Sequence, residues 1–186
     1  MQKPPVYIGS EVYRQSSFGH NHPLSYARQE SVLDMVRVLG WLPEQMFLTS
    51  SQADIDTLTQ FHNSDYVQAL KRADGEGKAR VSDRENYNFG TMENPLFKGV
   101  FKRASTTIGG SILAAQTTMG GGTVFHPSGG THHGRADKAS GFCYFNDPVF
   151  AIREFLSAGL ERILYVDIDA HHGDGVEAAF ADEERV

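Results

Sequence analysis

The sequence predicts an α/β protein with three layers, in which helices cover both faces of a mainly parallel β-sheet. Two apolar runs of strand length, at 123–126 and 162–168, are separated by a helical pattern at 149–156. A second short helical pattern follows at 176–180. Parallel neighbours need a long crossover, which is usually a helix. The order strand, helix, strand, helix therefore favours a parallel sheet with crossover helices.

The N-terminal half begins with a short apolar segment at 6–8, which suits a strand, and a loop at 17–23 rich in Gly, Asn and Pro. A helix is then predicted to end at Gly40, because apolar residues recur at helical spacing before it. A second helix is predicted at 64–73, with Ser64 as its N-cap. The charged stretch at 74–94 is predicted to be a long surface loop.

The C-terminal half begins with a helical pattern at 96–118 rich in small residues, which the three glycines at 120–122 end. A Gly- and His-rich loop follows the strand at 123–126 and runs to Tyr144. The next helix is predicted to start at Asn146 or Asp147 and to close at Gly159. The apolar run at 162–168 then predicts a buried parallel strand.

Composition bounds the class of protein. The 186 residues are 40% hydrophobic and 11% aromatic, which is ordinary for one globular domain with a sizeable core. A net charge of −6 with scattered Lys and Arg argues against direct nucleic-acid binding. A single cysteine excludes an internal disulfide, and neither a membrane-spanning run nor a signal peptide is visible. We expect a cytoplasmic protein without membrane contact, and the sequence is compatible with an oligomer.

Acidic and imidazole side chains gather where the run at 162–168 ends. Alternate residues of a strand point the same way, so Asp167, Asp169 and His171 would share one direction. A carboxylate and an imidazole two residues apart can bind one divalent ion, and ligands collect at the carboxyl ends of parallel strands. A single Asp or His is more often a cap or an ordinary polar residue. Burying this much charge without compensation would cost several kcal/mol per ion, so a metal site is favoured.

A second cluster, His132 and His133, lies in the Gly-rich loop. Adjacent histidines on an extended backbone point apart, so they suit two different tasks. Each would need a carboxylate to fix its tautomer, and Asp167 and Asp174 remain once Asp169 is assigned to a metal. Two such pairs beside a metal-bound water suit acid–base hydrolysis. From this loop alone, a histidine pair lining a solvated turn is an equal alternative.

Three long motifs resemble signature segments of the histone deacetylase superfamily, which includes acetoin-utilisation proteins and acetylpolyamine amidohydrolases. They are GGTHHG at 129–134, ASGFCYFND at 139–147 and YVDIDAHHGDGVE at 165–177. Weaker matches are GHNHP at 19–23 with Arg28, FHNSDYV at 61–67 and ENPLF at 93–97. The resemblance implies an arginase/deacetylase-like fold, incomplete in this chain, with residues 1–186 as the N-terminal portion of a single deacetylase-like catalytic domain.

The implied activity is zinc-dependent removal of acetyl or other acyl groups from lysine side chains or small acetylated amines. Asp169 and His171 resemble two of the family's three zinc ligands. The third ligand, an Asp, and the tyrosine that donates to the oxyanion lie downstream of this region in the family, so weak or absent activity is expected for this polypeptide alone. Backbone carbonyls around 167–171 resemble a structural K⁺ site.

The resemblance also implies roles around the substrate. His132 resembles the histidine paired with a buried Asp, here Asp167, and His133 the one paired with Asp174. The histidines share the activation of water and the protonation of the leaving amine, and the sequence leaves open which does which. The remaining implied positions are the tunnel walls Gly141 and Phe142, with Cys143 behind them, the exit-channel Arg28, and the rim residue Glu93. Many relatives carry an Asp at this rim position that grips the substrate backbone, so Glu93 puts peptide recognition in doubt.

Other readings compete with this one. Ureohydrolases place two manganese ions at a similar strand end but favour Asp-x-His-x-Asp, and the acid after His171 is Asp174, one position too far. A non-catalytic deacetylase-like module that binds an acyl ligand or a partner is a different class, which binding without turnover would reveal. An esterase is disfavoured because no Gly-x-Ser-x-Gly elbow is present. Nothing in the sequence separates acetyl-lysine from acetylated small amines as the substrate.

Overall fold

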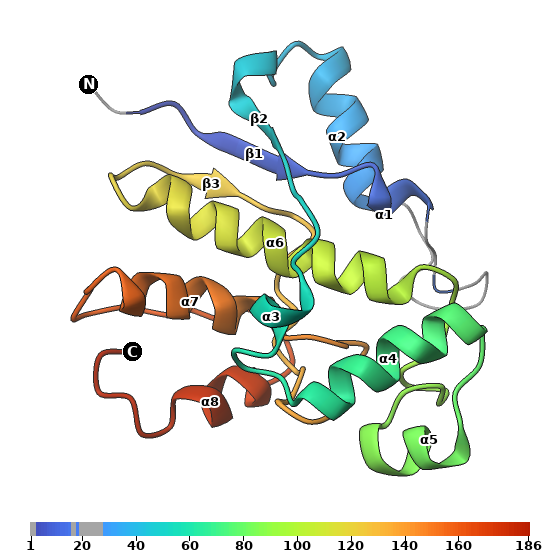
Figure 1. The fold of residues 1–186 in the computed structure, drawn as a ribbon. Helices are drawn as coiled ribbons and strands as arrows, with labels where there is room; N and C mark the ends of the chain where they lie inside the picture. The colour runs from blue at the N-terminus through green and yellow to red at the C-terminus, as the bar shows by residue number, and fades with distance from the viewer. Residues whose placement is uncertain (1–2, 16–17, 19–27) are drawn as a thin grey trace.

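A computed structural model describes residues 3–15, 18 and 28–186 and contains a three-stranded parallel sheet (Figure 1). The strands are β1 (Val6–Gly9), β2 (Phe47–Thr49) and β3 (Val124–Phe125), in the order β2-β1-β3. Both neighbours pair with β1 in parallel, with Tyr7 opposite Phe47 on one side and opposite Phe125 on the other. The predicted parallel sheet and its strands near 6–8 and 123–126 are confirmed, whereas β2 was not predicted.

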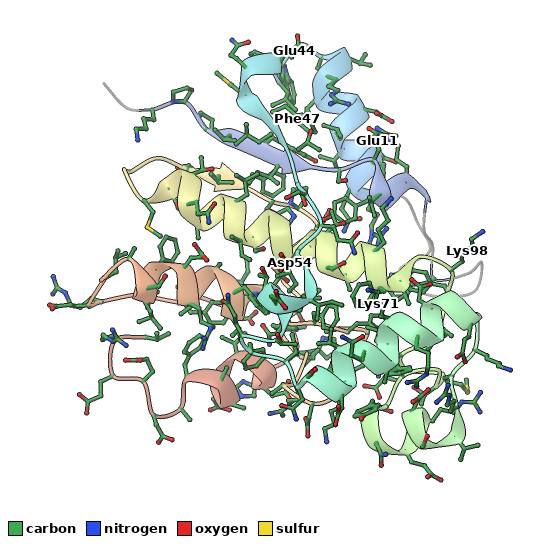
Figure 2. The ribbon with its side chains drawn as sticks, in the orientation of Figure 1. Glu11, Glu44, Phe47, Asp54, Lys71 and Lys98 are labelled. Atoms are coloured by element: carbon green, nitrogen blue, oxygen red, sulfur yellow. The ribbon has the colours of Figure 1, made fainter. Side chains whose placement is uncertain are left out.

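Aromatic side chains reinforce the strand pairing. The Tyr7 ring stacks on Phe47 with 6.0 Å between centroids and meets Phe125 edge-on at 5.5 Å. The Arg37 guanidinium lies 4.6 Å from the centroid of Phe47, whose position on β2 is labelled in Figure 2. Such cross-strand and cation–π contacts each contribute up to about 1 kcal/mol. They help to hold three very short strands in register.

Helices surround this sheet. They are α1 (Val12–Gln15), α2 (Arg28–Val38), α3 (Ile55–Leu58), α4 (Ser64–Glu76), α5 (Val81–Tyr87), α6 (Val100–Thr118), α7 (Asp147–Ser157) and α8 (Asp174–Phe180), with a 3-10 turn at Glu44–Met46. The long helix α6 crosses the centre of the molecule, against β1 and β3 on one side and α4 and α7 on the other (Figure 1). No helix of the described segments is both long and apolar enough to cross a bilayer. The predicted α/β class is confirmed.

Helix ends follow local chemistry, with two corrections. Gly40 and Gly159 have φ of +69° and +84° after α2 and α7, as predicted for C-terminal caps, and Asn146 caps α7 through Val149 N–H. The N-cap of α4 is Asn63 rather than Ser64. The second correction concerns α6, which begins at Val100 rather than 96, because Gly99 precedes it at φ +86°.

The stretch at 74–94, predicted to be a surface loop, contains the helix α5. Asp83 in α5 is buried and accepts a 2.6 Å bond from Arg72 in α4. Asp74 also accepts bonds from the backbone of Gly99 and Phe101, at 2.7 and 3.1 Å, and so caps the start of α6. The charged residues that suggested a surface loop instead tie α4 to α5 and α6.

The apolar core lies between α4, α6 and α7 and the segment at 139–145. Its fully buried large side chains include Tyr66, Phe89, Ile108 and Phe145. The Tyr66 hydroxyl donates to the Tyr144 carbonyl, so the one polar atom of that buried ring has a partner. This core fixes the floor beneath the Gly- and His-rich loop.

The predicted buried strand at 162–168 is wrong in this structure. The segment is extended but belongs to no strand, and Leu164, Val166 and Ile168 are 86%, 67% and 94% exposed. Within the part of the chain that the structure describes, no strand pairs with it and no layer covers this face. Apolar residues in a run are buried only where another strand or helix packs against them. The predicted loop at 17–23 lies, apart from Phe18, outside the described residues.

Candidate functional site

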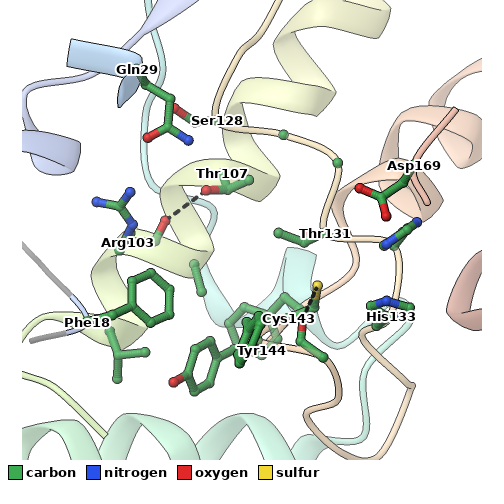
Figure 3. A pocket seen from close by; sticks show the side chains of 18 of the residues that line it. Phe18, Gln29, Arg103, Thr107, Ser128, Thr131, His133, Cys143, Tyr144 and Asp169 are labelled. Carbon is green, nitrogen blue, oxygen red and sulfur yellow. Dashed lines mark hydrogen bonds between the residues drawn. The ribbon is translucent and has the colours of Figure 1, made fainter. Parts of the chain in front are cut away.

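A cavity of about 710 Å³ opens between the Gly- and His-rich loop, the segment at 141–145 and the end of the extended segment. Asp169 and His133 lie at one end of it, and Phe18, Arg103 and Gln29 at the other (Figure 3). The predicted site residues on its wall are Arg28, Glu93, His132, His133, Gly141, Phe142, Cys143, Asp169 and His171. Asp167 and Asp174 stand behind the two histidines.

His132 is almost fully buried, and its Nδ1 lies 2.7 Å from Oδ2 of Asp167. The same oxygen accepts a 2.7 Å bond from the Tyr165 hydroxyl, and Oδ1 accepts the backbone N–H of Asp169. These bonds, from Tyr165 first and then His132, lower the pKa of Asp167 to about 2. The ionised carboxylate holds the proton of His132 on Nδ1, which leaves Nε2 as the reactive nitrogen.

His133 forms a similar pair with a different neighbour. Its Nδ1 lies 2.6 Å from Oδ1 of Asp174, while Arg135 donates to Oδ2 of the same carboxylate. Burial raises the pKa of Asp174, but the bond to His133 and the charge of Arg135 outweigh it, so the pKa is lowered overall. The two imidazole rings lie 4.1 Å apart between centroids. Two histidines with separate carboxylates thus face one cavity.

Asp169 and His171 offer the donor types of a metal site. Nδ1 of His171 lies 2.9 Å from Oδ1 of Asp169, which also accepts the backbone N–H of His171 at 2.8 Å. Nδ1 is the ring nitrogen that lies beside the Asp169 carboxylate, and in the tautomer with its proton on Nε2 it offers a lone pair; an imidazole nitrogen beside a carboxylate oxygen suits zinc. The two residues therefore fit a metal ion as two of its ligands. Among residues 3–15, 18 and 28–186, no three His, Cys, Asp or Glu side chains gather closely enough to hold an ion.

The segment at 141–142 forms a tight wall beside His133. Gly141 has φ +52°, and a Cβ there would lie 2.3 Å from Cδ2 of His133, so only glycine fits. Phe142 also has a positive φ, +68°, which costs a bulky residue about 1–3 kcal/mol. Its N–H donates to Asn94 at 2.9 Å, and the Gly141 N–H donates to Glu93 at 2.7 Å. The predicted rim residue Glu93 is thus bonded to the wall itself.

Two other histidine and cysteine positions have different environments. Cys143 is buried behind the wall, and burial raises its pKa to about 12, so its thiol is a poor nucleophile. His172, adjacent to His171, instead faces solvent and pairs with Glu177 at 2.8 Å. Neighbouring histidines therefore have separate surroundings, one in the cavity and one outside it.

Similarity to known proteins agrees with this geometry. The family model of the histone deacetylase domain matches residues 22–186. The chain belongs to the histone deacetylase family. This membership confirms the resemblance carried by the three motifs, and it disfavours the ureohydrolase reading.

The relatives of this deacetylase-family chain include the acetoin utilization protein AcuC of Bacillus subtilis, 36% identical over 95% of this chain and 46% of that protein. Histone deacetylase 8 of Xenopus tropicalis is 34% identical over 95% of this chain and 48% of its own length. Among solved structures, an HDAC homolog from Aquifex aeolicus superposes with a TM-score of 0.93 at 34% identity, over 98% of this chain and 49% of that one. The chain spans about half the length of these relatives. The arginase/deacetylase-like α/β fold is confirmed.

Several residues at the site were not among the predicted ones. Tyr165 and Arg135 each donate to a carboxylate of a His–Asp pair, and Asn94 holds the wall. Tyr165 precedes Asp167 by two positions, so their shared side of an extended segment was a usable signal. Arg135 and Asn94 reach partners 39 and 48 positions away, which no local pattern indicates.

Proposed function

We propose that the protein carrying this chain is a metal-dependent deacetylase that hydrolyses the amide of an acylated amine. The observation that carries the proposal is the pair of adjacent histidines, each bonded through Nδ1 to its own carboxylate, on the same cavity as Asp169 and His171. Membership of the histone deacetylase family supports the same chemistry.

Asp169 and His171 would hold the metal, for which zinc is the proposed ion. When bound, zinc supplies a Lewis acid that polarises the amide carbonyl and lowers the pKa of a water. The other residues handle protons. Nε2 of one histidine accepts the proton of the attacking water, and Nε2 of the other donates to the leaving nitrogen. Asp167 and Asp174 orient the rings through the 2.7 and 2.6 Å bonds and stabilise whichever imidazolium forms.

The proposed substrate is an acylated lysine side chain or an acetylated small amine. The aromatic rings of Phe18, Phe97 and Phe142 line the cavity together with Gly129, Gly130 and Gly141, which suits an aliphatic chain. A solved HDAC homolog complexed with SAHA also superposes on this chain with a TM-score of 0.93. Because Glu93 is engaged with Gly141 and Asn88, we propose that it supports the wall rather than gripping a peptide backbone.

The test is acetate release by the natural polypeptide that contains these residues. An acetyl-lysine peptide and an acetylated diamine are offered in parallel, with Zn²⁺ and with a chelator. The proposal predicts release from at least one substrate, lost with the chelator and restored by Zn²⁺. Ligand binding without release from either substrate would support the non-catalytic module instead. Release that survives complete metal removal would contradict the proposal.

A further inference from the structure

Two adjacent residues at the start of α7, Asn146 and Asp147, form side-chain hydrogen bonds with the loop that carries both histidines. We propose that Asn146 and Asp147 are a positioning pair that sets the place of His132 and His133 through the loop backbone. Its meaning for catalysis rests on the proposed function, whereas its effect on ring position can be tested without turnover.

Asp147 holds the loop on the N-terminal side of the histidines. Its carboxylate is buried, and Oδ1 accepts the N–H and the hydroxyl of Thr131 at 2.7 and 2.5 Å. Oδ2 accepts the N–H of Gly130 at 3.1 Å and the Ser111 hydroxyl at 2.5 Å. Four donors surround this carboxylate, and three of them belong to the two residues directly before His132.

Asn146 holds the loop on the C-terminal side. It is fully buried, and its side-chain Nδ2 donates to the carbonyls of His132 and Gly134 at 3.2 and 2.9 Å. Its Oδ1 accepts the N–H of Val149 and caps α7 at the same time. Every side-chain donor and acceptor of Asn146 is therefore used, and both of its donors go to the loop.

His62 adds a further connection between the loop and α7, at Arg135. Its Nε2 accepts the backbone N–H of Asn146 at 3.2 Å, and its Nδ1 lies 3.0 Å from the carbonyl of Arg135. Burial lowers the pKa of His62 to about 4, so the ring is neutral at neutral pH. Only the tautomer with its proton on Nδ1 satisfies both contacts, which joins Arg135 to the start of α7.

Close packing leaves the loop little room to relax. A Cβ at Gly129 would lie 2.7 Å from Oδ2 of Asp147, and one at Gly134 would lie 2.7 Å from the backbone of Phe145. A Cβ at Gly175, in α8, would lie 2.5 Å from the His132 carbonyl and 2.8 Å from Nδ2 of Asn146. The start of α8, which carries Asp174, therefore packs on the carbonyls that Asn146 binds. Asn146 and Asp147 thus connect the loop of the histidines with the helix that carries Asp174, the partner carboxylate of His133.

The experiment uses near-isosteric variants that reverse the hydrogen-bonding sense. Asp147→Asn places an amide donor against loop donors, and Asn146→Asp keeps the α7 cap but loses both donors to the loop. Asp83→Asn is the matched control, because Asp83 is also a buried, bonded carboxylate but lies in α5. Proton and ¹⁵N NMR of histidine-labelled protein follow the low-field Nδ1–H signals of the two His–Asp pairs, and chemical denaturation follows stability.

We expect Asp147→Asn and Asn146→Asp to shift or abolish these signals while a cooperative unfolding transition remains, and Asp83→Asn to lower stability without moving them. In the natural polypeptide, kcat should fall by about 100-fold with KM little changed, as for a displacement of about 1 Å in catalytic groups. Unchanged signals in both folded variants would overturn the proposal, whether or not turnover is found. Absence of wild-type turnover together with shifted signals would overturn only the proposed function.

If both variants fail to fold, Thr131→Val decides the matter. It removes the hydroxyl that donates to Oδ1 of Asp147 and accepts the Asp147 N–H, but it keeps the N–H bonds of Gly130 and Thr131 to the carboxylate. Shifted low-field signals in this milder variant would support the positioning pair, and unchanged signals would overturn it.

Discussion

Substitution of Gly141 by alanine tests whether the wall segment fixes the catalytic geometry of His133. The added methyl carbon would lie 2.3 Å from Cδ2 and 2.8 Å from Cγ of the His133 ring. Because carbon atoms pack at about 3.5–4.0 Å, the ring or the wall must move by about 1 Å. A shift of that size would lengthen or break the 2.6 Å hydrogen bond from His133 to Asp174. The left-handed backbone adds about 1–2 kcal/mol, and overpacking adds about 1–3 kcal/mol.

Gly159→Ala is the matched control for this variant. Gly159 also has a positive φ, but a Cβ there meets nothing within 4 Å. It should lose only the conformational part of the unfolding free energy and keep both His–Asp signals. Urea denaturation and NMR of labelled histidines measure the two effects separately. The reasoning is refuted if Gly141→Ala loses no more stability than Gly159→Ala and keeps the Nδ1–H signal of His133.

Three further predictions follow from the same contacts. Tyr165→Phe removes the hydrogen bond that contributes most to the lowered pKa of Asp167, so this pKa should rise from about 2 toward its ordinary 3.8 in a carboxyl ¹³C titration. The stabilisation from the depressed pKa is present above about pH 4 and lost as pH falls toward 2, and an unmoved midpoint would contradict the assignment. Cys143, with a pKa of about 12, should react with a thiol reagent slowly in the native protein and quickly in urea, and equal rates would show that it is accessible. Glu93→Ala should speed hydrogen exchange at the Gly141 amide but not at the Phe142 amide, which Asn94 holds; equal acceleration at both would argue against separate anchors.

The elements that the sequence predicted have local signals, and those it missed depend on distant partners. Apolar spacing located α2, α4 and α7, and Gly40, Asn146 and Gly159 marked ends of α2 and α7, because glycine and asparagine end and begin helices for local reasons. The helix α5 was missed because its charged sequence resembles a loop. It is stabilised in part by the contact of Asp83 with Arg72, eleven positions away.

The extended segment shows the opposite error. Its apolar residues predicted burial, but Leu164 and Ile168 are exposed because no described element covers them. An apolar side chain indicates that a residue can be buried, but it does not show which neighbours surround that residue.

The candidate site was predictable in its residue types but not in its pairings. A carboxylate and an imidazole two positions apart indicated Asp169 and His171 from the residues alone. The pairs of His132 and His133 with their carboxylates span 35 and 41 positions, so periodicity could not select them. Only the family resemblance indicated which carboxylate belongs to which histidine.

The proposed function depends most directly on a catalytic metal that the cavity binds through His171 and Asp169. His171→Asn and His172→Asn form a matched pair, because the two histidines are adjacent and only His171 lines the cavity. Zinc content and acetate release are measured together on the natural polypeptide that carries this sequence. We predict that His171→Asn lowers both and that His172→Asn changes neither. Equal losses in the two variants, or full zinc content and release in His171→Asn, would contradict it.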